Sequence, residues 1–378
     1  MEIAEDIASE TFLLAAQTWS MEGPPPNPTA WLYSVAKNKA KNALHRNALF
    51  AKKISPEVKR HSAEGYEQEL DLSPQNILDS QLQMMFAICH PSISPEAQIG
   101  LSLRILCGFG IEEIADAFLT NKETINKRLH RAKERLREEK INIGMPAASA
   151  IDQRMEAVLT TIYLLFNEGY YSISQNSILL KDFCLEAIRL CYMLVENTLT
   201  NKPKVNALLS LMCFHASRFD ARLDANGEHI LYEEQDTSLW NAELIGKGGY
   251  FLKAATSGTE ISKYHMMAGI AYWNTQKADT DEKWEQILQL YNQLLRIEYS
   301  PIAALNRTFA LSKARSKELA IKEALKLDLS TNQFYFSLLG ELYTGLDDKK
   351  AKQHFKKSYD LAKTDRDKQT IQRKIDRL

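Results

Sequence analysis

Apolar and polar residues recur with helical spacing through most of the chain, and residues 122–140 show the pattern most clearly. Ile125, Leu129 and Leu136 fall on one side of a helix with Ala132 between them. The opposite side carries eight lysines and arginines against four glutamates. The spacing therefore predicts one long basic helix over this stretch.

A second pattern lies directly upstream, where residues 111–118 predict a short helix and Leu119–Asn121 a tight turn. A short helix, a three-residue turn and a long basic helix form the helix-turn-helix arrangement, which places its second helix in the DNA major groove. Asn121 or Thr120 is expected to cap the second helix. A solvated amphipathic helix packed on a bundle is the alternative, and the preceding helix and turn favour DNA binding.

The N-terminal part predicts two more helices, separated by a break at Gly23–Pro28. Residues 2–20 form an acidic amphipathic helix. The next helix interleaves aromatic side chains with basic and amide side chains. In such a pattern the aromatic rings can stack on unpaired nucleobases while the cationic side chains follow the phosphate backbone. An exposed basic face with core aromatics is the alternative interpretation. The candidate residues for melted DNA are Trp31, Tyr33, Lys37, Asn38, Lys41, Asn42, His45 and Arg46.

The remaining chain is also predicted to be helical, so we expect an all-α fold. Residues 51–75 are polar and read as a linker, and Ser94 followed by Pro95 is typical of a helix start. From residue 151 onward a new helical region begins. Asn226-Gly227 predicts one small β-hairpin within it.

Composition and charge narrow the class of protein. The net charge is −1, yet residues 31–60 carry +7 and residues 122–150 carry +4, while residues 1–30 carry −5 and 61–121 carry −8. Two basic stretches separated by acidic ones suggest two contact patches on one polyanion. Five cysteines without metal-ligand spacing suggest free thiols, and the lack of a signal peptide or membrane span predicts a cytoplasmic protein. No phosphate loop, metal site or nucleophile motif is present in the sequence, so we expect no enzyme activity and no cofactor.

These motifs together resemble the sigma-70 family of RNA polymerase factors, in its extracytoplasmic-function class. The stretch EDIASETFLLAAQTW is similar to the region 2 helix that docks on polymerase, and AWLYSVAKNKAKNALHR is similar to the −10 recognition helix. The stretch SPEAQIGLSLRILCGFGIEEIADAFLTNKETINKRLHRAKERLRE resembles region 4, which reads the −35 element. The family has another helix before the docking helix, whereas this sequence starts on the docking helix itself. We therefore expect that helix to be missing from region 2, through a misassigned start, a trimmed chain or its loss from this copy.

The resemblance implies RNA polymerase core and promoter DNA, both duplex and melted, as partners. It implies region 2 over residues 1–50, a linker over 51–75, region 4 over 76–142 and a helical extension over 151–378. The implied polymerase contacts are Asp6, Glu10, Phe12, Leu13 and Trp19. The implied −35 contacts are Lys122, Thr124, Asn126, Lys127, Arg128, Arg131 and Lys133.

The extension resembles degenerate tetratricopeptide repeats, because small and aromatic residues recur in its final third at Ala320, Ala324, Ala351, Phe355 and Ser358. Such repeats bind a protein or peptide ligand, and the subgroup of factors with long extensions implies a regulatory role. A helical-repeat scaffold with a degenerate sigma front end is the alternative function. A polar group is interpreted as hairpin packing and salt bridges between helices, with a ligand or catalytic pocket as the alternative. Its members are His215, Arg218, Asp220, Arg222, Glu233, Glu234, Asp236 and Trp240.

Overall fold

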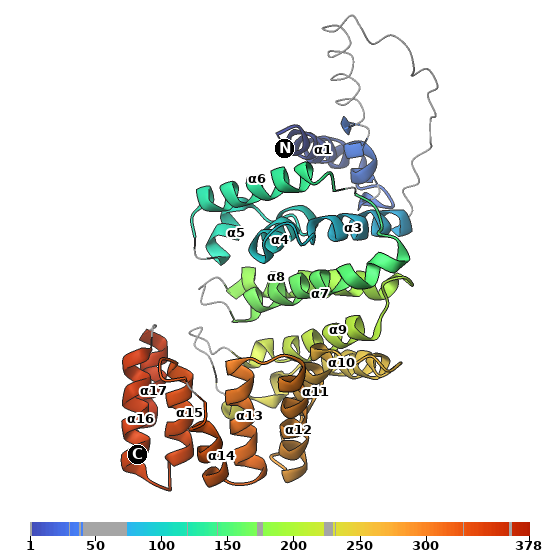
Figure 1. Cartoon of the computed structure of the whole chain (residues 1–378). Helices are drawn as coiled ribbons and strands as arrows, with labels where there is room; N and C mark the ends of the chain where they lie inside the picture. Colours follow the sequence, from blue (N-terminus) through green and yellow to red (C-terminus); the bar gives the residue numbers. More distant parts are fainter. Residues whose placement is uncertain are drawn as a thin grey trace, which may run out of the picture. The chain divides into compact units, whose positions relative to one another are not determined.

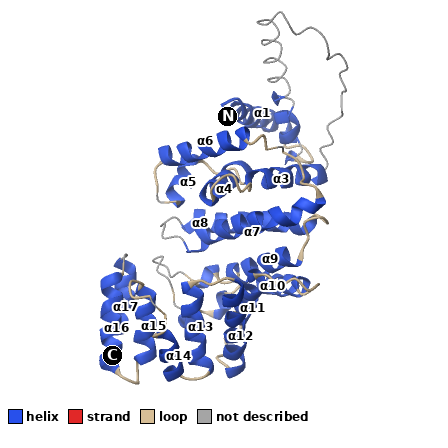
Figure 2. Cartoon of the chain, in the orientation of Figure 1, coloured by secondary structure: helices blue, strands red, loops and turns tan. Residues whose placement is uncertain are grey.

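The computed structural model is all-α, and no strand occurs in the part of the chain that it describes (Figure 2). The described residues are 2–29, 31–37, 39–40, 74–118, 120–141, 143–171, 177–222, 230, 232–327, 329–362 and 365–378. Contacts divide the chain into two compact units. The first comprises Met1–Ala87 with Asn142–Met145, and the second comprises Ile88–Ile141 with Pro146–Leu378.

The first unit contains the acidic helix α1 (Glu2–Glu22), a helical stretch within residues 28–40 and most of α3 (Pro74–Ile88). Rings and charges join its helices. Trp19 of α1 meets Trp31 edge to face with ring centroids 5.4 Å apart. Lys39 Nζ lies 2.6 Å from a carboxylate oxygen of Glu10. The acidic helix is thereby tied to the basic one that follows it.

The second unit begins with the helix-turn-helix and continues into the long helical extension (Figure 1). Its first elements are α4 (Pro95–Leu101), a π-helical turn (Ser102–Leu106), α5 (Ile111–Ala117) and α6 (Lys122–Glu138). The Ser94 side chain accepts a hydrogen bond from the Ala97 N–H, so the predicted cap is confirmed. Gly108 takes a φ of 80°, where glycine is least strained, and separates the π-helical turn from α5.

The extension is a succession of helices that pack on their neighbours in sequence. They are α7 (Ala148–Tyr171), α8 (Ser177–Glu196), α9 (Pro203–Ala216), α10 (Ala242–Ala255), α11 (Lys263–Trp273), α12 (Asp281–Ile297), α13 (Pro301–Ala314), α14 (Lys317–Ala324), α15 (Gln333–Tyr343), α16 (Asp348–Leu361) and α17 (Asp365–Asp376). Helix α9 is apolar around its circumference and is buried because α7, α8, α10 and α11 all contact it.

The predicted repeat positions lie in the core of the last helices. Ala320, Ala324, Ala351 and Ser358 are fully buried and Phe355 is 1% exposed. Helices α15 and α16 approach closely because Gly340 faces the Phe355 ring, where a Cβ atom would come within 2.5 Å. The small residue at position 340 thus allows the two helices of this pair to pack closely.

The segment predicted as a β-hairpin differs from that prediction where it is described. Its turn, Asn226-Gly227, lies outside the described residues. The flanking residues form 3-10 turns, η2 (Phe219–Ala221) and η3 (Tyr232–Glu234), instead of strands. Arg222 explains part of the difference, because its guanidinium lies 3.7 Å from the Tyr170 ring centroid and donates to the Tyr170 carbonyl. The Ile230 N–H still donates to the Arg222 carbonyl at 2.8 Å, so one backbone hydrogen bond closes the loop although no strand forms in the described residues.

The back of the helix-turn-helix is packed against the extension, since α4 contacts α7 and α5 contacts α8. The rings of Phe109 and Phe183 meet edge to face at 4.6 Å. Arg189 of α8 donates through Nη2 to the carbonyl of Leu106 at 3.0 Å, at the end of the π-helical turn. These contacts join the two parts into one packed body.

A buried polar contact lies at the same junction. Thr161 of α7 and Gln98 of α4 are 2% and 6% exposed, and the Thr161 hydroxyl lies 2.7 Å from Gln98 Oε1. The Gln98 amide nitrogen donates to the carbonyls of His90 and Ile93 at 3.0 and 3.1 Å. All the polar atoms of this glutamine side chain are therefore engaged.

Replacing Thr161 by Val keeps the shape of the side chain but leaves Gln98 Oε1 buried without a donor. We expect the free energy of unfolding to fall by about 1–3 kcal/mol. Thr161→Ser retains the hydroxyl and serves as the control. Urea denaturation followed by circular dichroism measures the effect, and a valine variant as stable as the serine variant would contradict it.

Two adjacent glycines of α10 offer a matched test of its packing on α9. A Cβ at Gly248 would lie 2.6 Å from Phe214 Cε1, whereas a Cβ at Gly249 would meet no atom within 4 Å. Gly248→Ala should destabilise the protein by about 1–3 kcal/mol through overpacking. Gly249→Ala should be neutral or stabilising by up to about 1 kcal/mol, because alanine favours the helix. Thermal unfolding of both variants tests this packing. Equal melting temperatures would show that α9 and α10 do not approach closely at Gly248.

Candidate nucleic-acid interface

Helix α6 is held in place by a cap and an apolar seam. The Asn121 side chain accepts a hydrogen bond of 2.8 Å from the Thr124 N–H, which confirms the predicted cap. Ile125, Leu129 and Ala132 are 1%, 1% and 4% exposed. The remaining sides of the 17-residue helix are free to carry charge.

Helices α4 and α6 approach each other where glycine removes a side chain. A Cβ at Gly100 would lie 2.9 Å from Leu129 Cδ2, so this position favours the smallest residue. The contact brings the start of α4 beside one flank of α6. The two elements enclose a groove of about 500 Å³. Its walls are formed by Ser92, Ile93, Ser94, Ala97, Thr124, Lys127, Arg128, Arg131, Ala132 and Arg135.

The groove is strongly cationic. It has four basic side chains and no acidic one among its lining residues. Lys127 and Arg131 are exposed and form no ion pair or hydrogen bond within the described part of the chain. The guanidinium of Arg128 lies 5.9 Å from the centroid of the Phe118 ring, and Arg135 pairs with Glu139 at 2.8 Å. Two cations are therefore positioned by neighbours while two remain available to a ligand.

The seven predicted −35 contacts do not share one surface. Thr124, Lys127, Arg128 and Arg131 line the groove, whereas Lys122, Asn126 and Lys133 do not. Lys122 Nζ lies 2.6 Å from a Glu112 carboxylate oxygen, and this hydrogen bond lowers the pKa of Glu112. Asn126 is exposed and Lys133 is half-buried. Lys122, one of the basic residues predicted to contact the −35 element, thus forms an ion pair with α5.

Three polar lining residues were missing from the predicted interface, namely Ser92, Ser94 and Arg135. The basic pattern of residues 122–140 includes Arg135, so its spacing from Arg128 and Arg131 on the helix was the available signal. Ser92 and Ser94 come from the turn before α4, and only the tertiary contact with α6 brings them there. The Ser94 side chain lowers the pKa of Glu96 by hydrogen bonding, which keeps that neighbouring carboxyl ionised.

The predicted melted-DNA residues are only partly described. Tyr33 is 39% exposed and its hydroxyl accepts a hydrogen bond from Gln81 at 3.1 Å. Trp31 is half-buried against Trp19, and Lys37 is exposed. The other candidates lie outside the described residues: Asn38, Lys41, Asn42, His45 and Arg46.

The predicted polymerase contacts lie on α1. Phe12 and Leu13 are 63% and 60% exposed, which is unusual for adjacent large apolar side chains. Asp6 and Glu10 are exposed beside them. Thr11 and Ala15 are instead the buried positions of this helix, each 3% exposed. The helix thus presents an apolar and acidic surface.

Two other kinds of feature are absent from the described residues. No cluster of histidine, cysteine, aspartate and glutamate there could hold a metal ion. None of the described helices combines the length and apolarity needed to cross a bilayer.

Comparisons with known proteins match two segments of the chain. Residues 1–49 match the model of sigma-70 region 2, and residues 154–256 match a family of unknown function, DUF6596. The chain is 33% identical over 347 residues to the uncharacterized protein R00370 of Rhizobium meliloti (strain 1021), an alignment covering 90% of this chain and 82% of that protein. No solved structure matches the chain. The chain therefore belongs to the same family as R00370 and carries a sigma-70 region 2 at its N-terminal end.

Proposed function

We propose that this protein is an RNA polymerase sigma factor of the extracytoplasmic-function class, which directs promoter-specific initiation in the cytoplasm. The observation that carries the proposal is the sigma-70 region 2 match followed in the same chain by a helix-turn-helix whose second helix borders a cationic groove. Region 2 alone supports a sigma-like protein. A helix-turn-helix in the same chain, with a cationic groove beside its second helix, supports promoter recognition.

The helix-turn-helix would bind the −35 duplex through α6. Lysine and arginine contacts to phosphates position a helix in the major groove, and residues of its first turns read base edges. Lys127 and Arg131 suit the first role because they line the groove and form no ion pair with any described residue. Thr124 and Asn126 are exposed on the first turns and suit the second.

Region 2 would supply the other two contacts. Aromatic and basic side chains at Trp31, Tyr33 and Lys37 would hold melted −10 DNA by stacking and charge. Phe12 and Leu13, with Asp6 and Glu10 beside them, would dock α1 on the polymerase core.

The extension would regulate the factor by binding a protein or peptide on its helical repeats. The contacts of α7 and α8 with α4 and α5 support such a role, because they connect the first helices of the extension physically to the helix-turn-helix. The second candidate function is an interaction scaffold in which the repeats are the active part. It is favoured only by the size of the extension, and it does not account for the free cations of α6.

Removal of a groove cation tests the DNA contact. Lys127→Ala and Arg131→Ala should each weaken binding to a labelled duplex by about eightfold at 0.1 M salt and reduce the slope of log K against log salt by about 0.9. Arg137→Ala is the matched control, since Arg137 is exposed on the same helix but does not line the groove. Fluorescence anisotropy across a salt series gives both quantities. If all three variants bind like the parent, α6 faces protein and not DNA.

Transcription separates the two candidate functions. With bacterial core polymerase and a pool of randomised promoters, the protein should select a common −35 and −10 pair, read by sequencing transcript 5′ ends. A Phe12→Ala, Leu13→Ala double variant should lose most initiation and co-elution with core, because the apolar docking surface is gone. The control removes similarly exposed residues of the repeats, Leu325→Ala with Phe334→Ala. Random initiation with intact co-elution would favour the scaffold.

A further inference from the structure

Two aromatic rings and two cationic side chains form a cluster, called the box below, beside the segment that connects α9 to α10. The rings of Tyr232 and Trp240 lie 6.2 Å apart at 33°. The guanidinium carbon of Arg218 is 5.3 Å from the first ring centroid and 5.8 Å from the second. Lys277 Nζ is 5.2 and 5.8 Å from the same two centroids. Residues from separate elements thus bring positive charge to one place.

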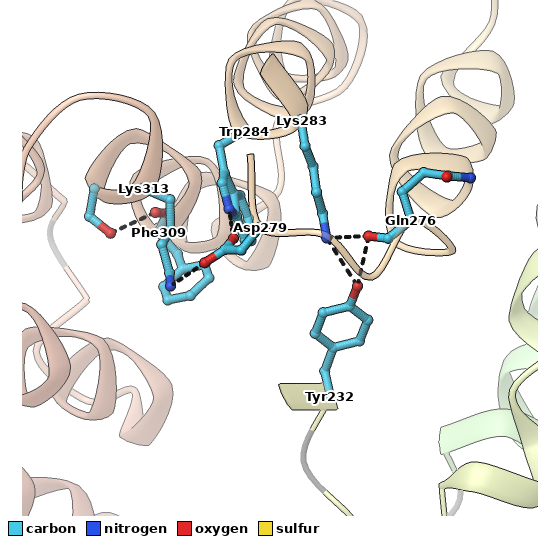
Figure 3. A network of polar contacts seen from close by, with 8 residues as sticks. Tyr232, Gln276, Asp279, Lys283, Trp284, Phe309 and Lys313 are labelled. Atoms are coloured by element: carbon cyan, nitrogen blue, oxygen red, sulfur yellow. Dashed lines mark hydrogen bonds and ion pairs between the residues drawn. The ribbon is translucent and has the colours of Figure 1, made fainter. Parts of the chain in front are cut away.

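A third cation lies at the edge of the box. Lys283, at the start of α12, is 1% exposed, and its Nζ donates to the Tyr232 hydroxyl at 3.0 Å and to the Gln276 carbonyl at 2.6 Å (Figure 3). Lys277 donates to the carbonyls of Tyr232 and Gln235 at 2.9 and 3.0 Å. Every acceptor on these two lysines is neutral.

Three of the carboxylates nearby have other partners. Asp279 accepts from the Trp284 indole and lies 3.5 Å from Lys313 (Figure 3). Asp236 caps a 3-10 turn by accepting from the Ser238 N–H, and Glu234 lies 4.0 Å from Arg377. Glu233 is exposed. Within the described part of the chain, no carboxylate forms an ion pair with Arg218, Lys277 or Lys283.

Unmet hydrogen-bonding groups accompany this unpaired charge. Trp240 and Gln235 are 9% and 8% exposed, and Trp240 Nε1 and Gln235 Oε1 have no hydrogen-bond partner among the described residues. The Arg218 side chain also makes no hydrogen bond within the described residues. Its guanidinium N–H groups therefore remain available to a planar or tetrahedral oxyanion.

We propose that this cluster is a binding site for the phosphate group of a small ligand. Arg218 binds two phosphate oxygens through its paired N–H groups, and Lys277 and Lys283 supply the remaining charge. Carboxylates bear one negative charge, whereas a phosphate approaches two near neutral pH and better offsets three converging cations. The site lies where the DUF6596 segment ends and the repeats begin, and it does not depend on promoter recognition.

Thermal unfolding of the full chain tests the proposal. Inorganic phosphate at a hundredfold excess over its Kd should raise the melting temperature by about 5 °C relative to chloride at equal ionic strength. Arg218→Gln should abolish the ligand-specific shift. Arg296→Gln, an exposed arginine of α12 without an ion pair in the described chain, should retain it. Equal shifts in these two variants would overturn the site.

Two further arms identify the source of the phosphate and guard against misfolding. Adenosine 5′-monophosphate and adenosine are compared with inorganic phosphate. Tighter binding of the nucleotide than of inorganic phosphate assigns an organic phosphate, and the reverse assigns the free ion. Intrinsic fluorescence should change on titration and lose that change in Trp240→Phe. Arg218→Lys keeps the charge but loses the paired donors, so its affinity should fall at least about tenfold; unchanged affinity would also overturn the proposal.

Discussion

The burial of the back of the helix-turn-helix against α7 and α8 is the constraint on which the second unit depends. Thr161 reaches Gln98 in a buried polar contact, and Arg189 holds the carbonyl that ends the π-helical turn. Separation of the helices would break both bonds and expose to water the apolar surface packed around them, including the Phe109 and Phe183 rings, which makes separation costly. With this side occupied, α6 is left with its basic flank toward solvent.

The same constraint explains how a chain with a net charge of −1 presents a cationic surface. Several basic side chains of the described chain form ion pairs, such as Lys122 with Glu112 and Lys39 with Glu10. Lys127 and Arg131 are not, because the nearest structural element is the start of α4, which places serines beside them. Local placement, and not total charge, therefore decides where a polyanion could bind.

Local signals in the sequence predicted much of this structure. The period of Ile125 and Leu129 and the side chain of Asn121 fixed the position of α6 because both act within a few residues. The sequence could not predict which basic residues of α6 line the groove and which lie elsewhere on the helix, since this depends on where α4 and α5 pack. The same holds for Ser92 in the groove, and for Thr161, which meets Gln98 across 63 residues of sequence. The polar group around Trp240 was recognised, but its lysines come from α11–α12 and carried no local pattern.

The position of the extension limits how it could act on DNA binding. Its main contacts with the helix-turn-helix are those of α7 with α4 and of α8 with α5 and the π-helical turn, and none of the residues that line the groove comes from the extension. A ligand of the repeats that affected DNA binding would therefore have to change the orientation or stability of α5 and α6, without covering the groove itself. Arg189 is suited to transmit such a change, because α8 carries it and its guanidinium contacts the turn directly before α5. Regulation by this route would alter affinity gradually, whereas masking of α6 would abolish binding outright.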